Sequence, residues 1–221
     1  MKIALGYILT FGWVFLTLGL TLALKKAVGA DDEVSRKIVH VSVAFAWIPM
    51  VLCFGTSWHL LVPPAVFIVL NTVSYRKGLF AAMERTDESK KSLGTVYYAV
   101  SMTVMALWTR LIPACLPAYG AGLFCMALGD GFAPVFGRIR KGNRPLFGGR
   151  TLYGSLSVFV ICLLVLIVFN AIFALALPFW QLLLTALAAV LLELIGVKGL
   201  DNLTLPLGVF VLVFFFIKAT R

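Results

Sequence analysis

Charged side chains are scarce in this sequence. Asp, Glu, Lys and Arg make up 13% of its 221 residues, whereas hydrophobic residues make up 62%, and the mean hydropathy is +1.03. This balance excludes an ordinary soluble domain, in which roughly a quarter of the residues are charged. The sequence therefore predicts an integral membrane protein of the all-α, polytopic class.

Long linkers, repeats and low-complexity tracts are also lacking, so we expect a single membrane domain over residues 1–221. Because a spanning helix needs about 20 apolar residues, the apolar runs fit eight transmembrane helices. Seven is the alternative, since the third and eighth runs are short. The eight runs cover residues 3–24, 36–54, 58–73, 92–109, 113–130, 152–169, 178–196 and 203–217.

Two familiar motifs are missing. The four cysteines form no C-x-x-C pair and all lie within apolar runs, so we interpret them as small core residues that say nothing of the redox compartment. The segment "GGRT" at 148–151 is not a Walker A loop, because it has Arg where that motif requires Lys and because residue 144 is Arg instead of Gly.

The basic residues are distributed unevenly between the two ends of the predicted helices. Fifteen of the 19 Lys and Arg lie in the loops after the first, third, fifth and seventh runs. By the positive-inside rule these loops are cytoplasmic and both termini lie outside. The net charge of +10 is then mostly explained by membrane topology, and no nucleic-acid partner is expected.

Acidic residues number nine, and all of them lie in or beside the predicted cytoplasmic loops. For the acids at 31–33 and 84–88, the greater length of these loops is an equally good explanation. Asp130, Glu193 and Asp201 differ, because each lies at the end of an apolar run, where an ionisable side chain is costly and indicates function. We therefore expect a substrate that needs carboxylates and cations to be handled at the cytoplasmic face.

Asp130 lies between two glycines and precedes a basic, glycine-rich loop at 137–155. Glycines let backbone amides approach phosphate oxygens, and arginines pair with those oxygens through two hydrogen bonds. A carboxylate beside bound phosphates suits Mg²⁺. This combination favours phosphate chemistry over an ordinary basic inner loop.

Two further basic clusters begin predicted helices. In "SRKIVHVS" at 35–42, Arg36 and His40 share one helical face, although a basic membrane anchor is the simpler interpretation of that segment alone. In "ESKKSLGTVYY" at 88–98, lysines precede a helix start, which is a typical anion site. Lysines that reach the membrane surface explain the second cluster equally well.

The segment 193–208 holds Glu193, Asp201, Asn202 and Pro206. A proline breaks a helix that runs through it, so we expect irregular backbone at 199–205, at membrane depth. Such backbone is tolerated where it lines protein or a wet cavity. Asp201 and Asn202 are then candidate ligands for a metal or a phosphate, with helix capping by Asp201 as the alternative.

Taken in order, the motifs "RKIVH", "SLGTVYY", "GDGFA…GR", "GRTLYGS" and "E…LDNLTLPL" resemble the polyprenol kinase family, which includes phytol, farnesol and dolichol kinases. The resemblance spans about residues 35 to 208. The pattern "GD…G…G-S" is shared with the related phosphatidate cytidylyltransferases. Two positions depart from the family: Pro134 stands where phytol kinases often have a second Asp, and Arg150 stands where a Lys is usual.

The resemblance implies CTP-dependent transfer of the γ-phosphate to the hydroxyl of a membrane-dissolved isoprenoid alcohol. From the residues themselves we expect Mg²⁺ as cofactor, and an integral protein of the cell membrane if the source is prokaryotic. We assign Asp130, Asp201, Asn202 and Glu193 to cation binding, with Asp130 or Asp201 also acting as base. The residues expected to hold or shape the nucleotide phosphates are Arg36, Lys37, His40, Lys91, Ser92, Gly94, Gly129, Gly131, Arg138, Gly149, Arg150, Thr151, Gly154 and Ser155.

Three other functions fit parts of the pattern. A cytidylyltransferase would use a similar site to make a CDP-lipid, and a CTP-dependent diacylglycerol kinase would differ only in its acceptor. A transporter or non-catalytic scaffold fits less well, because the outer half of the predicted helices has few charges to continue a path across the bilayer. The sequence leaves the acceptor, the nucleotide base and the oligomeric state open.

Overall fold

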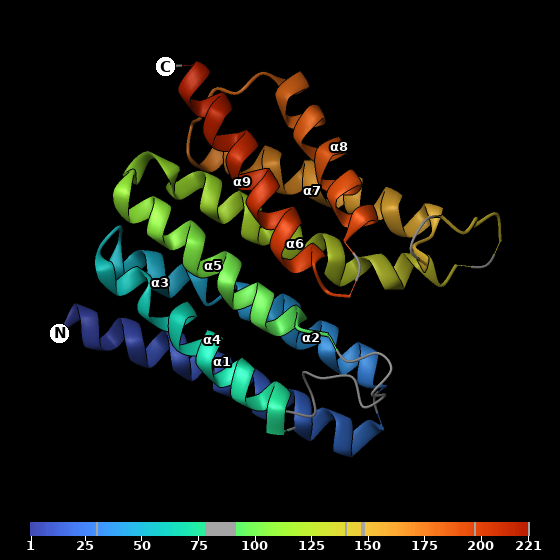
Figure 1. Cartoon of the computed structure of the whole chain (residues 1–221), viewed down its shortest axis with the longest axis horizontal. Helices are drawn as coiled ribbons and strands as arrows, with labels where there is room; N and C mark the ends of the chain where they lie inside the picture. The colour runs from blue at the N-terminus through green and yellow to red at the C-terminus, as the bar shows by residue number, and fades with distance from the viewer. Residues whose placement is uncertain (30, 78–91, 140, 147–148, 197, 221) are drawn as a thin grey trace. The chain divides into compact units, whose positions relative to one another are not determined.

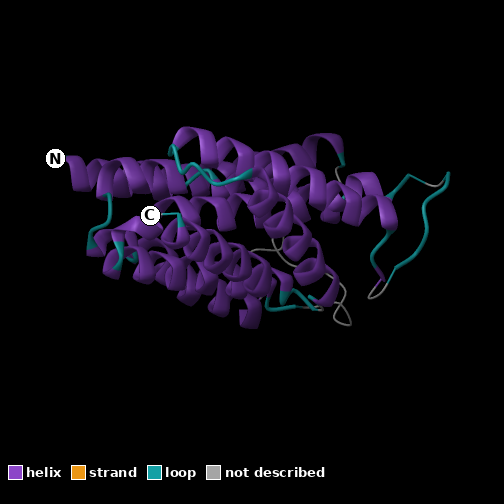
Figure 2. Ribbon diagram, turned by 90° about the horizontal axis from the view of Figure 1, so that it is seen from above, coloured by secondary structure: helices purple, strands orange, loops and turns teal. Residues whose placement is uncertain are grey.

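The computed structural model describes residues 1–29, 31–77, 92–139, 141–146, 149–196 and 198–220. Within these ranges the chain is built from helices joined by loops (Figure 2), which confirms the predicted all-α, polytopic fold class. The chain divides into two compact units, Met1–Leu111 and Ile112–Arg221. Each unit is considered by itself.

The first unit contains the elements α1 (Lys2–Val28), α2 (Asp32–Ala44), α3 (Trp47–Phe54), η1 (Trp58–Leu60), α4 (Val62–Lys77) and α5 (Gly94–Leu111). Here α1 packs against α2 and α3, and α4 packs against α5 (Figure 1). The expected second run is split into α2 and α3, because Pro49 has no N–H to donate to the preceding turn.

The second unit contains η3 (Pro113–Cys115), α6 (Leu116–Gly137), α7 (Leu152–Ile172), α8 (Phe179–Ile195) and α9 (Asp201–Ala219). α6 packs against α7 and α9, and α8 packs against both of these helices (Figure 1). The span formed by η3 and α6, Pro113–Gly137, is the most buried of the candidate spans. Its many glycines and alanines allow this, because small side chains let helix backbones approach closely in a membrane.

One such approach joins α6 to α9. A Cβ added to Gly122 would collide with the backbone carbonyl oxygen of Pro206 and would lie 3.3 Å from the backbone N of Phe210. Only glycine fits there without moving a helix. Gly122 therefore helps to fix α9, which begins at Asp201, against α6, which carries Asp130.

Every one of the eight expected runs forms helix. Six helical segments of the described chain are long and apolar enough to span a membrane, and α8, with 17 residues, is a shorter apolar helix. α5 has 18 residues but is less apolar than these segments, because tyrosines, threonines and Arg110 interrupt its apolar sequence. The side of the membrane on which the termini lie stays a prediction.

The expectation of irregular backbone over 199–205 is wrong for 201–205, which are helical, whereas 199 and 200 form a turn. α9 starts at Asp201 and continues through Pro206 to Ala219. A proline removes only one helical hydrogen bond, and Pro206 lies close to the helix start, where few bonds depend on it. The first turn is closed instead by short-range bonds, in which the amides of Asn202 and Leu203 donate to the carbonyls of Gly199 and Leu200 at 3.2 and 2.9 Å.

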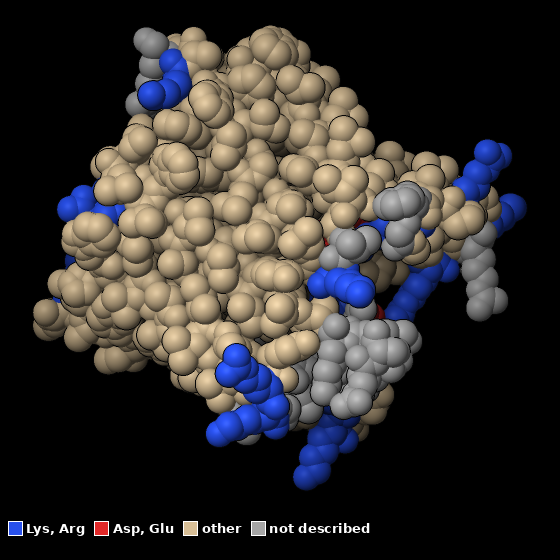
Figure 3. Space-filling model, in the orientation of Figure 1, with Lys and Arg blue, Asp and Glu red and all other residues tan. Residues whose placement is uncertain are grey.

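The surface drawn in Figure 3 agrees with a membrane location. Broad tan areas cover most of this face, with few blue Lys and Arg side chains among them. Large apolar side chains such as Leu20, Leu52 and Phe215 are more than half exposed. In a membrane these side chains contact lipid, so their exposure does not indicate a docking surface.

Candidate active site

Four helix ends meet at one end of the second unit: the C-terminal ends of α6 and α8 and the N-terminal ends of α7 and α9. α6 carries Asp130, α8 carries Glu193, and α9 begins with Asp201. All three residues are buried, with exposed fractions of 5%, 1% and 6%. The carboxylates that sequence reasoning picked out at separate span ends therefore belong to one cluster.

Arg150, just before α7, joins these carboxylates. Its Nε lies 2.9 Å from Oε1 of Glu193, its Nη2 lies 2.5 Å from Oδ2 of Asp201, and its Nη1 lies 3.9 Å from Oδ1 of Asp130. Nη2 also donates a hydrogen bond of 3.2 Å to the carbonyl of Gly196. One guanidinium thus contacts three helices, which its forked geometry permits.

The charge of Arg150 is secure in this environment. Burial lowers the pKa of Arg150, but the negative charges of Glu193, Asp201 and Asp130 outweigh burial and raise that pKa above its ordinary value. Removing one member of such a buried group leaves the others poorly compensated, which typically destabilises a protein by about 3–5 kcal/mol. The cluster is therefore structural as well as a candidate for chemistry.

Two residues that sequence reasoning missed bring these helix ends together. Asn143 donates from Nδ2 to the carbonyl of Gly137 at 2.9 Å and accepts at Oδ1 from the amide of Tyr153 at 3.0 Å, so it connects the end of α6 to the start of α7. Gly196 lets the end of α8 approach α9, since an added Cβ would lie 2.6 Å from the Cβ of Asp201. An isolated asparagine or glycine in a loop gives no sequence signal of such a contact.

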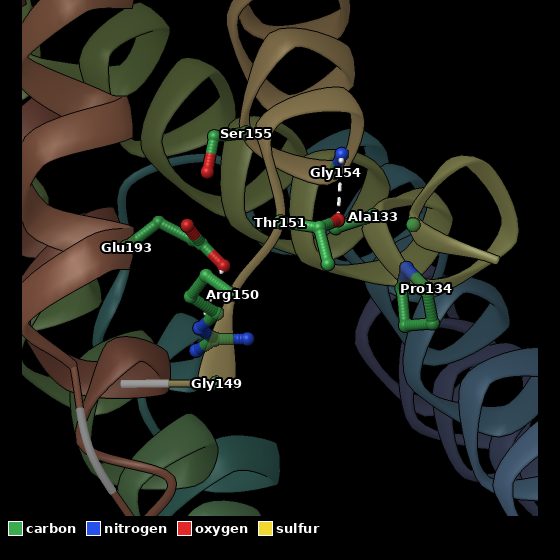
Figure 4. A pocket seen from close by; sticks show the side chains of 9 residues that line it. Ala133, Pro134, Gly149, Arg150, Thr151, Gly154, Ser155 and Glu193 are labelled. Carbon is green, nitrogen blue, oxygen red and sulfur yellow. Dashed lines mark hydrogen bonds and ion pairs between the residues drawn. The ribbon is translucent and has the colours of Figure 1, made fainter. Parts of the chain in front are cut away.

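A cavity of about 210 Å³ opens beside Arg150 (Figure 4). It is smaller than the roughly 300–1,000 Å³ of sites that enclose a whole drug-sized ligand, so its size suits a phosphate tail better than a complete nucleotide. Its lining residues are Ala133, Pro134, Gly137, Gly149, Arg150, Thr151, Gly154, Ser155 and Glu193. The proline that replaces the family's second acid therefore lies in the wall of this cavity.

Ser155 offers a hydrogen-bonding group to the cavity. Its side chain is 6% exposed, its Oγ has no hydrogen-bond partner within the described chain, and in Figure 4 that oxygen points toward Glu193 and Arg150. A buried hydroxyl without a partner is costly. A ligand in the cavity would supply the missing partner.

The backbone amides at the start of α7 already have partners. The amides of Leu152 and Tyr153 donate to the Arg144 carbonyl and to Asn143, that of Gly154 donates to Oγ1 of Thr151, and that of Ser155 donates to the Thr151 carbonyl. Gly154 is needed for packing, because its added Cβ would lie 3.2 Å from the carbonyl oxygen of Ala133. In this conformation, side chains are the groups available to bind a phosphate here.

The remaining predicted residues of the second unit have different surroundings. Asn202 is 6% exposed, and its amide donates to Oδ1 of Asp201 at 3.0 Å. Gly129 packs α6 against α7, with its added Cβ 3.2 Å from Sγ of Cys162. Gly131 is buried on α6, whereas Arg138 is exposed at the end of that helix.

The other predicted residues belong to the first unit. Arg36 pairs with Glu33 at 2.6 Å. The ring of His40 meets that of Tyr98 edge to face, with centroids 5.1 Å apart. Lys37 and Ser92 are half-buried, and Gly94 begins α5. Lys91 lies outside the described residues.

The donor set near Arg150 fits a hard divalent cation in its chemistry, because three carboxylates from three helices already surround one positive group. Among the residues that the structure describes, no group of three or more His, Cys, Asp and Glu side chains forms a ready metal site. Arg150 lies among the carboxylates, in the place that a cation would need.

Comparison with known proteins gives one relationship over nearly the whole chain. A phytol kinase from Synechocystis sp. is 30% identical over 222 aligned residues, which cover 93% of this chain and 88% of that protein. No protein-family model matches the chain. No solved structure matches it.

Proposed function

The chain belongs to the phytol and polyprenol kinase family, and we propose that it transfers the γ-phosphate of CTP to the hydroxyl of a membrane isoprenoid alcohol at the cytoplasmic face. The observation that carries this proposal is the convergence of Asp130, Glu193 and Asp201 on Arg150 beside a cavity of phosphate size. Phosphoryl transfer needs mainly positioning and charge neutralisation, and these side chains offer both.

Each side chain has a role in this proposal. Asp130, Asp201, Glu193 and Asn202 would hold Mg²⁺, which would neutralise the phosphate charge when it is bound. Arg150 and Ser155 would contact the phosphates in the cavity. The hydroxyl oxygen of the alcohol attacks the γ-phosphorus, the bond to the β-phosphate oxygen breaks, and the hydroxyl proton passes to Asp130 or Asp201. The nucleoside diphosphate then leaves.

The location of the site suits a lipid acceptor. The cluster lies toward the ends of α6, α7 and α9, which are long enough to span a bilayer, and of the shorter helix α8. An alcohol dissolved among the helices could present its hydroxyl there. The basic residues of the first unit, Arg36, Lys37 and Lys91, are assigned to the phosphates by the family resemblance. The proposal does not depend on them.

The test is a transfer assay on purified protein in detergent or nanodiscs. γ-Labelled CTP and ATP are offered with phytol, farnesol, a longer polyprenol, diacylglycerol or phosphatidate. A kinase puts the label on the lipid, whereas a cytidylyltransferase acting on phosphatidate releases it as pyrophosphate. Label on diacylglycerol alone would replace the isoprenoid acceptor, and absence of transfer to every acceptor would refute the kinase.

Site variants connect the activity to this cluster. We expect Asp130→Asn and Asp201→Asn to abolish transfer, because each keeps the size of the side chain and removes one negative charge. Asp32→Asn is the matched control, since Asp32 lies at the start of α2 and pairs with Lys25. Normal transfer by both site variants would refute the assignment.

A further inference from the structure

The proposed reaction requires Arg150 to contact the phosphates, but in this structure its guanidinium lies where the cation would bind. Its guanidinium contacts Asp130, Glu193 and Asp201, the carboxylates that a cation would need. It also lines the cavity in which phosphates would bind. A guanidinium and a cation cannot share the space among the same three carboxylates.

We propose that Arg150 is an exchangeable counter-ion: it holds the three carboxylates while the site is empty, and it moves to the donor phosphates when a divalent cation takes its place. The inference rests on the proposed function for the identity of the phosphate. The exchange conserves favourable pairing, because the carboxylates gain a cation as the guanidinium gains phosphate oxygens.

The backbone around Arg150 leaves room for this movement. Gly149 precedes it with a φ of 77°, and nothing lies within 4 Å of the position that a Cβ on Gly149 would take. The side chain of Arg150 is 24% exposed, whereas that of Glu193 is only 1% exposed. The arginine is therefore the more exposed member of the pair, whereas Glu193 is enclosed by the protein.

Ser155 marks the destination. Its buried Oγ points toward Arg150 from the wall of the cavity and has no hydrogen-bond partner within the described chain (Figure 4). A phosphate there would accept from Oγ of Ser155 and from the displaced guanidinium together. The buried Oγ of Ser155 is therefore a second observation, independent of Arg150, that indicates a ligand in the cavity.

The exchange makes Arg150 a competitor of the cation, and this is measurable without turnover. Binding of Mn²⁺ to nucleotide-free protein in detergent is followed by electron paramagnetic resonance of the free ion. We expect Arg150→Gln to tighten Mn²⁺ binding by at least about tenfold, because the ion then no longer has to displace a guanidinium. Even the smaller interaction energies measured between close charge pairs correspond to that factor in affinity. Arg150→Lys should fall between, since its single ammonium cannot contact Glu193 and Asp201 in the same way.

Arg144→Ala is the matched control, because it removes an exposed positive charge from the same connection between α6 and α7. It should leave Mn²⁺ affinity almost unchanged. Equal or weaker Mn²⁺ binding by folded Arg150→Gln would overturn the exchange. An increase as large in Arg144→Ala would also overturn it, since the effect would then be general electrostatics.

Arg150→Gln loses the counter-ion of three buried carboxylates and is the variant most prone to misfold. Thermal unfolding of wild type and Arg150→Lys over a range of Mn²⁺ concentrations provides the second measurement. The exchange predicts a larger rise in melting temperature for Arg150→Lys, and equal rises would overturn it. The kinase assay is separate: transfer by wild type without tighter Mn²⁺ binding in the variants refutes only the exchange, and tighter binding without any transfer refutes only the proposed function.

Discussion

Gly122 provides a test of how the fold positions the site. In Gly122→Ala the new methyl group would meet the backbone carbonyl of Pro206, and a backbone atom cannot turn aside as a side chain can. α6 and α9 must then separate locally. Because α6 carries Asp130 and α9 begins with Asp201, we expect their contacts with Arg150 to change as well.

The size of the effect follows from the packing. Forcing one extra methyl group into a close-packed interior typically costs about 1–3 kcal/mol. For a protein of this size each kcal/mol lowers the melting temperature by about 2–4 °C, so we expect a decrease of about 2–12 °C. The rate of phosphoryl transfer should fall together with the melting temperature, because small displacements of catalytic groups slow a reaction strongly.

Gly12→Ala is the matched control. Gly12 also lies within a helix, α1, but nothing lies within 4 Å of an added Cβ. Alanine favours the helix over glycine by about 1 kcal/mol, so this variant should unfold at an equal or higher temperature. Both variants are measured by thermal unfolding in the same detergent. If Gly122→Ala were as stable and as active as Gly12→Ala, the close contact between α6 and α9 would not position the site.

Two other substitutions at the start of α7 separate binding from stability. Ser155→Ala should leave the melting temperature unchanged or slightly higher, because the Oγ has no hydrogen-bond partner within the described chain to lose. Its kcat/KM for the nucleotide should fall about 10- to 100-fold, as for a lost hydrogen bond to a charged group. Unchanged kinetics would show that Ser155 is not part of the site. Thr151→Val should lower the stability by about 1 kcal/mol through loss of the helix cap, whereas Thr151→Ser keeps the cap and should unfold like wild type in the same melting experiment.

Position along the chain was enough to find the carboxylates. Asp130, Glu193 and Asp201 stand at the ends of apolar runs, where the cost of an ionisable group makes each one conspicuous. The positive-inside rule placed all three run ends on one side, and in the second unit they do lie at the same end. Hydropathy and the length of the apolar runs also predicted the helices, because those patterns are local.

The pairing within the site was not local and could not be predicted in the same way. Arg150 was assigned to phosphate alone, but it contacts Asp201 across 51 positions of sequence. The error at Pro206 has a different cause, because a proline removes one helical hydrogen bond without ending the helix here, as also at Pro134 in α6. The general rule that proline breaks a helix therefore did not predict that α9 begins at Asp201 and continues through Pro206.

The two departures from the family pattern lie in the same place, and the structure gives a physical reason to consider them together. Pro134 removes an acid from the wall of the cavity, and Arg150 replaces a lysine in that wall. A lysine has one charged centre, whereas Arg150 uses Nε for Glu193 and Nη2 for Asp201. The arginine can therefore contact one carboxylate from α8 and one from α9 at the same time. In this chain these two helices supply acidic groups beside the cavity, where α6 has Pro134 instead of a second acid.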